Sequence, residues 1–388
     1  MGKARTAGAR FATLMKWVGA AAALLSFGTA VYEVLHAQAE LRERKRVVGE
    51  QYSAASAQQA AGDFAAAWDS LARASAAAEP DGLIAKLLGG LSPQRRAVRT
   101  AQEDLAMLWV RDGRVTDDHE FSALADKLVG VLAAGAATSA GPRKADLLGH
   151  LGWAYFLKRR GGDLNVQPET AYRDAVAADA TNPYANVFWG HWILWNHGSL
   201  EEARARFRAA LATGRARPEV RHFQLAALAN VRTDEADAAW WQVVGEMHRN
   251  GEMLDEDVRG EMYSRYYFAL NDDAQLRRLQ AALPPADHIE LEHLLLQASP
   301  GDAARRGTLT AVLALMLEAA GRSEEALATW RALQAETRAE HGSALAARAD
   351  AAIKRLAGTM KHRPARSSNL WPTPGRITPL LSCAAVPV

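Results

Sequence analysis

Apolar residues recur with a helical period along most of the chain, and the densest example is the stretch 183–211. Its first half has aromatic and aliphatic residues at helical spacing: Phe188, Trp189, Trp192, Ile193 and Trp195. Its second half has one apolar face, formed by Leu200, Ala203, Phe207, Ala210 and Leu211. Between them Gly198 is expected to close the first helix, and Ser199 to cap the second, with Glu202 at the capping-box spacing. The pattern predicts a helical hairpin whose apolar faces require neighbouring hairpins.

This hairpin resembles a tetratricopeptide repeat (TPR), a helix-turn-helix unit of about 34 residues with small residues where the helices touch. The matching residues are Gly190, Gly198, Leu200, Ala203, Phe207 and Ala210, with one extra residue between the two glycines. Partial matches occur at Leu148, Leu151, Gly152, Tyr155, Tyr172, Ala175 and Val176; at Gly62, Asp63, Phe64, Ala67, Leu71, Ala74 and Pro80; at Gly321, Ala326, Trp330 and Leu333; and at Ala236, Trp240 and Val243. The resemblance implies an all-α, TPR-like α-solenoid of helical hairpins. No segment has the period-two pattern of a strand.

The N-terminal region contains an apolar run without a charged residue at 17–32, which reaches back to Phe11 if Lys16 snorkels. A helix over 11–32 would be about 33 Å long, enough for a hydrocarbon core of about 30 Å. Basic residues precede it at Lys3, Arg5, Arg10 and Lys16. We expect a transmembrane signal anchor that contacts the membrane through residues 11–36. Two alternatives stay open, a secretory signal cleaved after the small-x-small site 37–39 and a buried core helix.

Changes in composition divide the chain into four segments. We expect a basic segment and anchor over 1–36, a linker helix with an N-terminal helical part over 37–141, the TPR-like solenoid with a capping helix over 142–358, and a disordered, basic, Pro-rich tail over 359–388. A loop is expected at 135–141. The Ala-rich, Arg-rich composition is typical of a bacterial protein, here a membrane-anchored TPR protein of the inner membrane with one span.

The orientation across the membrane is weakly determined by charge. Four Lys or Arg residues precede the span, and four more follow soon after it at Arg42, Arg44, Lys45 and Arg46. The positive-inside rule therefore gives no decision. A short basic start usually stays in the cytoplasm, which slightly favours repeats on the periplasmic side.

Charge and motif content argue against several classes of function. The 46 basic and 44 acidic residues give a net charge of +2, so no nucleic-acid partner is expected. The single cysteine, Cys383, allows no disulfide within the chain and no thiolate zinc cluster. There is no Walker loop, no dinucleotide fingerprint and no nucleophile elbow. His288 and His293 are five residues apart, about 140° around a helix, so we interpret that segment as a solvated helix face. No catalytic residue, metal or cofactor is predicted.

The aromatic residues of the central repeats are the candidates for binding. In the TPR family the first helix of each repeat lines the concave face on which peptides bind, and this resemblance places six residues in a groove: Trp153, Phe156, Tyr184, His191, Leu194 and Trp195. Tryptophan and tyrosine make good anchors because they bury a large area and keep a polar group. Core packing is the alternative, and we favour it for Trp189 and Trp192.

These observations favour a membrane-tethered scaffold or adaptor that binds a protein or peptide partner, in the assembly or regulation of a bacterial envelope complex. One alternative is an enzyme with a site in 254–296, where titratable groups occur at Tyr263, Arg265, Tyr266, Tyr267, His288 and His293. An enzyme would require a deep pocket in which a carboxylate and a histidine lie within hydrogen-bond reach. The other alternative is a self-associating array, with a homo-oligomer formed by the solenoid ends or by the helix over 33–59.

Overall fold

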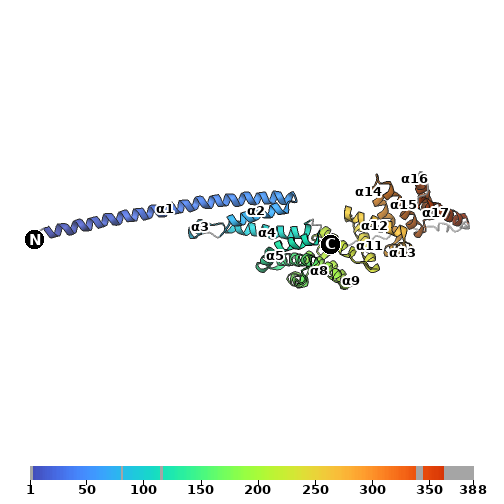
Figure 1. Cartoon of the computed structure of the whole chain (residues 1–388), viewed down its shortest axis with the longest axis horizontal. Coiled ribbons are helices and arrows are strands. Elements are labelled where there is room, and N and C mark those ends of the chain that lie inside the picture. The colour runs from blue at the N-terminus through green and yellow to red at the C-terminus, as the bar shows by residue number, and fades with distance from the viewer. Residues whose placement is uncertain (1–2, 80–81, 114–116, 338–343, 362–388) are drawn as a thin grey trace, which may run out of the picture. The chain divides into compact units, whose positions relative to one another are not determined.

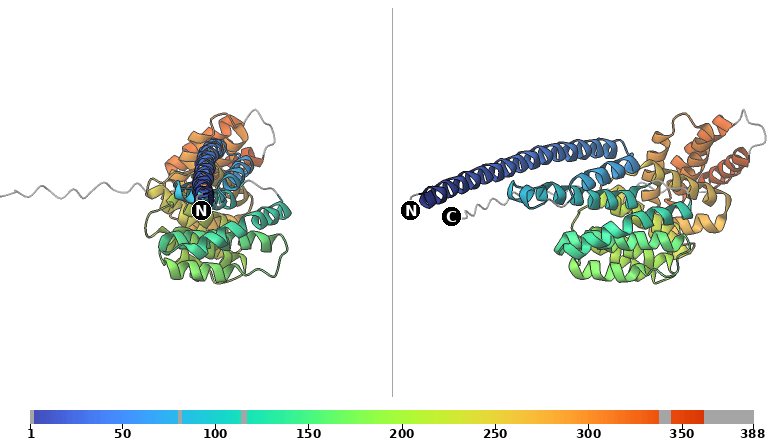
Figure 2. Two further views of the ribbon diagram at one scale, coloured as in Figure 1. Left: turned by 90° about the vertical axis from the view of Figure 1, so that its left-hand side faces the viewer. Right: turned by 60° about the vertical axis from the view of Figure 1, so that its left-hand side comes forward.

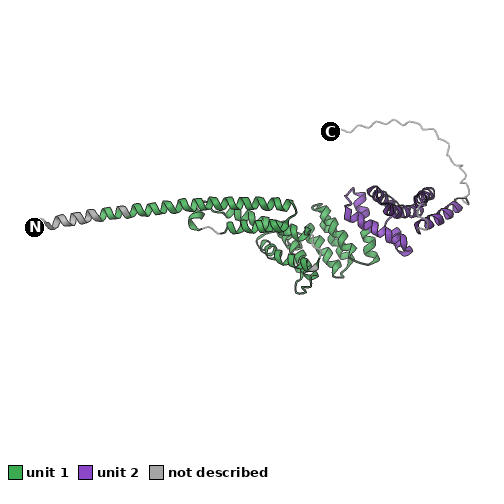
Figure 3. Ribbon diagram, turned by 45° about the horizontal axis from the view of Figure 1, so that its top comes forward, with its two compact units in different colours: residues 1–240 green, residues 241–388 purple. Residues whose placement is uncertain are grey.

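The protein is helical throughout the part of the chain that the structure describes. The structure is a computed structural model that describes residues 3–79, 82–113, 117–337 and 344–361. These ranges contain seventeen α-helices and no strand (Figure 1), which confirms the all-α prediction. Two compact units divide within one helix, at Trp240 and Trp241 (Figure 3).

The first unit begins with the long helix α1 (Lys3–Ala60), which is uninterrupted in the right-hand view of Figure 2. Its second half packs on α2 (Phe64–Ala77) and α4 (Ser92–Asp112), and the short α3 (Leu83–Leu87) also contacts it. The buried residues Leu41, Val48 and Ala55 are seven apart and therefore share one face of α1. The helix predicted over 33–59 is confirmed, as part of a longer one.

Successive hairpins follow in the same unit. Their helices are α5 (Asp118–Thr138), α6 (Gly141–Arg160), α7 (Pro168–Ala178), α8 (Pro183–Trp195), α9 (Leu200–Leu211), α10 (Arg217–Ala229) and α11 (Asp234–Arg249), which runs into the second unit. Helices α6 and α7 form one hairpin, and α8 and α9 the next; α6 also packs on α8, and α8 on α10. First helices of successive hairpins thus lie side by side, as in a TPR-like solenoid. The loop expected at 135–141 is wrong in extent, because residues 135–138 complete the last turn of α5.

Glycines allow the two helices of a hairpin to approach closely. A Cβ on Gly190 would lie 2.5 Å from Cε1 of Phe207, and a Cβ on Gly152 would lie 2.4 Å from Cε1 of Tyr172. Phe207 and Tyr172 are almost completely buried. Each hairpin is therefore closed by an aromatic ring of the second helix that occupies the space above a glycine of the first.

The turn between α8 and α9 differs in one detail from its prediction. His197, not Gly198, takes the left-handed conformation, with φ of 57°. Its N–H donates to the carbonyl of Leu194, and the N–H of Gly198 donates to the carbonyl of Ile193, the two bonds of a Schellman motif. Gly198 is needed for space instead, because a Cβ there would lie 2.8 Å from Cγ2 of Ile193. The predicted cap is confirmed, since Ser199 accepts from the N–H of Glu202.

The second unit contains the rest of α11 and six further helices: α12 (Glu256–Asn271), α13 (Asp273–Ala282), α14 (Pro285–Ala298), α15 (Ala303–Ala319), α16 (Ser323–Thr337) and α17 (Ala344–Lys361). Helix α15 packs on α12, α14 and α16, and α16 packs on α17. The repeat residues predicted around 321–333 lie as expected, with Ala326, Trp330 and Leu333 buried on α16. Residues 362–388, most of the predicted tail, lie outside the described residues.

Candidate functional site

An open cavity of about 1020 Å³ lies in the first unit at the C-terminal ends of α8 and α10. Its wall also includes the end of α6 and the turns that follow α8 and α10. Its lining includes Arg159, Leu164, His191, Leu194, Trp195, Asn196, Asn230, Arg232 and Glu235. Three of the six residues predicted for the groove, His191, Leu194 and Trp195, thus share one wall.

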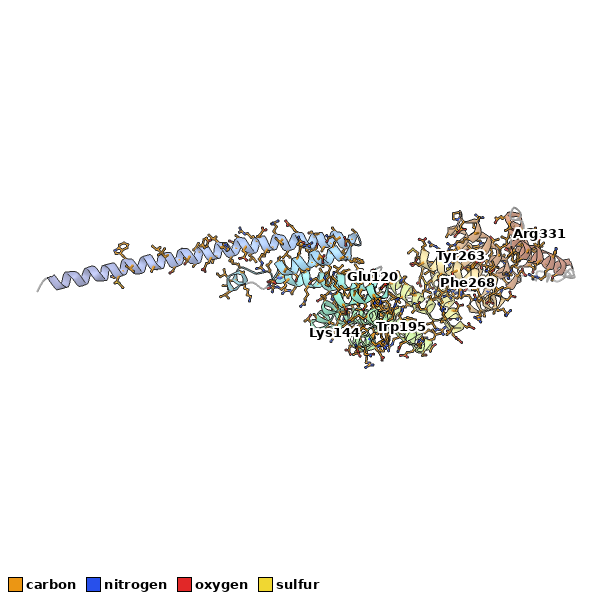
Figure 4. All side chains as sticks on the ribbon, viewed as in Figure 1. Glu120, Lys144, Trp195, Tyr263, Phe268 and Arg331 are labelled. Carbon is orange, nitrogen blue, oxygen red and sulfur yellow. The ribbon has the colours of Figure 1, made fainter. Side chains whose placement is uncertain are left out.

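Trp195 is the exposed tryptophan of the cavity wall. It is 36% exposed, whereas Trp189 and Trp192 on the same helix are buried core residues. Its ring stacks on Trp192 at 5.3 Å and meets Phe156 edge-on at 5.4 Å between ring centroids. Figure 4 labels Trp195 in the first unit. Packing on one side fixes the ring, and its other surface is available to a ligand.

Trp153 and Phe156 lie behind this wall and do not line the cavity. Trp153 is 6% exposed and Phe156 is 1% exposed. The Trp153 ring packs on Phe188 at 4.7 Å, on His191 at 5.1 Å and on Phe223 at 5.1 Å. Because their side chains are enclosed by α8 and α10, both residues support the wall from the core.

Tyr184, the sixth predicted residue, belongs to a different neighbourhood. It is half-buried, and Nη1 of Arg111 donates to its hydroxyl at 2.8 Å. The Arg111 guanidinium also lies 5.4 Å from the centre of its ring. Tyr184 therefore connects α8 with α4, at the opposite end of α8 from the cavity.

His191 is a neutral acceptor-bearing group at neutral pH. Burial lowers its pKa to about 4, against a weaker opposing effect of a hydrogen bond to the backbone of Phe223. Nδ1 of the ring is buried and has no hydrogen-bond partner. The wall of the cavity therefore contains a neutral imidazole with one unsatisfied nitrogen.

The rim of the cavity carries an excess of positive charge from Arg159 and Arg232 over Glu235. Nη1 of Arg159 donates to the carbonyls of Leu164 and Val166 at 3.2 and 3.3 Å, and its guanidinium lies 5.5 Å from the Trp192 ring centre. These contacts hold the long turn between α6 and α7 against the cavity, so this turn supplies part of the wall through Leu164.

The residues at 196–200 and 230–236 were missed by reasoning from the sequence. They lie in the turns after α8 and α10 and in the first residues of α9 and α11. The polar turn residues Asn196 and Asn230 end neighbouring first helices, which is a signal visible in the sequence. Only the stacking of α8 beside α10 shows that the two turns border one cavity.

The second unit has a buried polar cluster where an enzymatic site was considered. Nδ1 of His288 lies 3.1 Å from the hydroxyl of Tyr266, and Nε2 lies 2.9 Å from the carbonyl oxygen of Leu279. Both carboxylate oxygens of Glu292 lack a hydrogen-bond partner, so this carboxylate is not within reach of His288. His288, Tyr266 and Glu292 are fully buried. These groups therefore do not form the deep pocket, with a carboxylate and a histidine within hydrogen-bond reach, that an enzyme would require.

The interpretation of 288–293 as a solvated helix face is wrong for four of its six residues, because only Glu290 and His293 are exposed. His288 and Glu292 are four apart and share the inward face of α14 with Ile289 and Leu295, whereas His293 is exposed. Burial raises the pKa of Glu292 well above its usual value and lowers that of His288 to about 4. Among the described residues, no group of three or more His, Cys, Asp or Glu side chains could hold a metal ion.

Comparison with known proteins adds little to this picture. No family model matches the chain, and no curated protein matches it significantly. Among solved structures, the crystal structure of the P58(IPK) TPR domain matches at 13% sequence identity, covering 81% of this chain and 99% of that chain, with a TM-score of 0.17. A TM-score this low carries no argument, so the solenoid is defined here by the helix packing of the chain itself.

Proposed function

We propose that this chain is a membrane-tethered scaffold whose TPR-like hairpins bind an extended segment of a partner protein in the cavity at the end of α8. The observation that carries the proposal is Trp195, which is 36% exposed on the wall of an open cavity of about 1020 Å³. Buried tryptophans at interfaces supply a disproportionate share of binding energy. A rigid tryptophan that a partner can cover costs little conformational entropy on binding.

The chemistry of the wall favours a peptide over a small apolar ligand. Leu194 and Trp195 offer an apolar surface, while Asn196, Asn230 and Arg232 place polar groups at the rim. An extended peptide has an apolar side chain for the wall and backbone amides for the rim. The cavity is also at the upper end of the range of about 300–1,000 Å³ that small-molecule pockets occupy.

The tether is supported by the exposed apolar part of α1. One helix of the described residues, over Met15–Ala60, is long and apolar enough to cross a membrane, with a window of mean hydropathy 1.6 that is 0% buried. Leu24, Leu25 and Phe27 are each more than 70% exposed. A surface of this kind requires an apolar environment.

An uncleaved anchor is favoured over a cleaved secretory signal. Helix α1 continues without a break through Ala37 and Ala39, whereas proteolytic sites concentrate in exposed loops. We place the single span in a bacterial inner membrane, with the repeats on the periplasmic side and a role in assembling or regulating an envelope complex. Confinement to the membrane raises the effective concentration of a membrane-bound partner, so a modest affinity suffices.

The test is the affinity of a partner for the detergent-solubilised full chain. A protein captured with the wild type is purified and titrated against Trp195→Ala and against Phe268→Ala, a control that removes an aromatic side chain 56% exposed in the second unit. Loss of an anchor costs about 2 kcal/mol or more, which is about 30-fold in Kd. Equal affinity of wild type and Trp195→Ala would refute the groove, and accessibility of a C-terminal tag to external protease tests the orientation.

A further inference from the structure

A second apolar surface lies beside the proposed span, on the short helix α3. Leu83 and Leu87 are 76% and 79% exposed, the two most exposed leucines in the part of the chain that the structure describes. They are four residues apart and share one face with the exposed Lys86. The other face, with Ile84, Ala85 and Leu88, is partly covered. Two exposed leucines on a helix of one turn are costly in water and contribute nothing to the core.

The position of α3 along α1 follows from a ladder of contacts between α1 and α2. Ser70 lies 2.9 Å from the amide of Gln58, and Nε of Arg73 donates to Oε1 of Gln51 at 2.8 Å. Nearer the start of α1, Nε of Arg44 donates to the carbonyl of Ala77 at 2.9 Å. As α2 proceeds, its partners on α1 therefore move towards the N-terminus.

The segment that follows α2 continues past the level of Arg44, towards the N-terminus of α1. Nη2 of Arg44 also donates to the carbonyl of Glu79 at 2.6 Å, and α3 begins four residues later and contacts α1. Figures 1 and 3 both show α3 beyond the end of α2, on the side of the N-terminal part of α1. Ala37 and Gln38 are the first described residues of α1 that are partly covered, so α3 lies near the level where the span proposed at 11–36 ends.

We propose that α3 inserts Leu83 and Leu87 into the headgroup and acyl boundary of the same bilayer leaflet that α1 leaves, as a second membrane contact. This inference rests on the proposed tether. The occupant is a lipid surface and not a protein, because α3 contacts α1 near the level where the exposed apolar part of α1 ends. Exposed basic residues lie on α1 and α4 near this level, namely Arg42, Lys45 and Arg96, with Lys86 on α3 itself. They suit anionic headgroups.

A second contact changes what the tether does. A single helix leaves the first unit free to tilt relative to the membrane plane, whereas a second contact in the same leaflet restricts this tilt. Interfacial insertion of apolar side chains beside basic residues is the chemistry of peripheral membrane helices. Because α3 joins α2 to α4, its insertion orients the first helical layer, and the hairpins after it, relative to the membrane surface.

The test uses a fluorophore attached to the thiol of Lys86→Cys in the full chain, in a Cys383→Ser background, with both leucines kept. The protein is reconstituted into vesicles of phosphatidylcholine and phosphatidylglycerol that carry no quencher, a nitroxide near the headgroup, which reports on position 86, or a nitroxide deep in the acyl chain, which reports on position 25 at the middle of the span. Position 25, within the span, is the reference for the tether, and position 164 is the control, since Leu164 is 68% exposed on a turn between α6 and α7.

We expect quenching at 25 and 86 but not at 164, and loss of quenching at 86 in the Leu83→Asp, Leu87→Asp variant. These leucines are largely exposed, so the variant keeps the wild-type circular dichroism spectrum. Quenching at 25 without quenching at 86 overturns the α3 contact and leaves the tether intact. Quenching at 86 that survives the two aspartates also overturns it. Absence of quenching at 25 refutes the tether, and the α3 proposal with it.

Discussion

Replacing Gly190 by alanine tests whether the α8–α9 hairpin is closed by direct contact between backbone and ring. The added Cβ would lie 2.5, 2.9 and 3.1 Å from three ring carbons of Phe207. Phe207 is 1% exposed and is enclosed in the core, so its ring cannot swing into solvent. The first contact is about 1 Å shorter than the optimal separation of two carbons, at about 3.5 Å, so α8 and α9 must separate.

Two opposing contributions set the size of the effect. Overpacking of a filled core costs about 1–3 kcal/mol, and a contact with the ring as short as this one indicates the upper part of that range. Replacing a glycine by alanine in a helix interior stabilises the helix by about 1 kcal/mol, because alanine has the higher helix propensity. We expect a net destabilisation of about 1–2 kcal/mol.

The control is the same substitution at Gly130, in the interior of α5, where a Cβ meets nothing within 4 Å. Gly130→Ala should stabilise the first unit by about 1 kcal/mol through propensity alone. The stability changes of the two variants should have opposite signs, and the difference between them is the cost of the contact with the Phe207 ring. A double variant, Gly190→Ala with Phe207→Leu, should show a favourable coupling energy, because the smaller side chain removes the clash.

The assay is urea unfolding of the full chain in detergent, combined with amide hydrogen exchange of α8 and α9. Hydrogen exchange is needed because a repeat array need not unfold in one step, and local opening reports the hairpin itself. If Gly190→Ala raised the protection of α8 and α9 as much as Gly130→Ala raises that of α5, the close contact between glycine and ring would be refuted.

Three further predictions concern single residues. His197→Gly should stabilise the first unit by about 1 kcal/mol, because glycine adopts φ of 57° without strain, and an unchanged urea midpoint would contradict this. Burial raises the pKa of Glu292, so above pH 4.5 the folded state keeps a proton that the unfolded state loses. The free energy of unfolding therefore falls by up to about 1.4 kcal/mol for each unit by which the pH rises. Glu292→Gln should flatten this dependence in thermal scans. His191 has the opposite effect on the pH dependence of stability, because burial lowers its pKa in the folded state to about 4. Its contribution to stability is complete above pH 6.5 and is lost as the pH falls towards 4. The stability of His191→Phe should be less sensitive to acid between these values, and identical pH profiles of variant and wild type would refute the burial of a neutral imidazole.

The elements of this chain could be predicted from local pattern. The helical period of apolar residues marked α8 and α9, the Ser199 cap marked the start of α9, and the uncharged run marked the exposed part of α1. Each depends on residues within a few positions of one another, and helix periodicity and capping act over that distance. The resemblance to a TPR likewise implied small residues where the two helices of a hairpin touch, and Gly190 and Phe207 were among its matching residues.

Tertiary packing decided which side of each helix is covered, and therefore which candidates can bind. Trp153 and Trp195 look alike in the sequence, yet α8 and α10 enclose the first while the second remains 36% exposed on a cavity wall. The polar pattern of α14 indicated a solvated face, but the neighbouring helices bury His288 and Glu292. A sequence determines the periodicity of a helix by itself, whereas burial depends on neighbours brought together from distant parts of the chain.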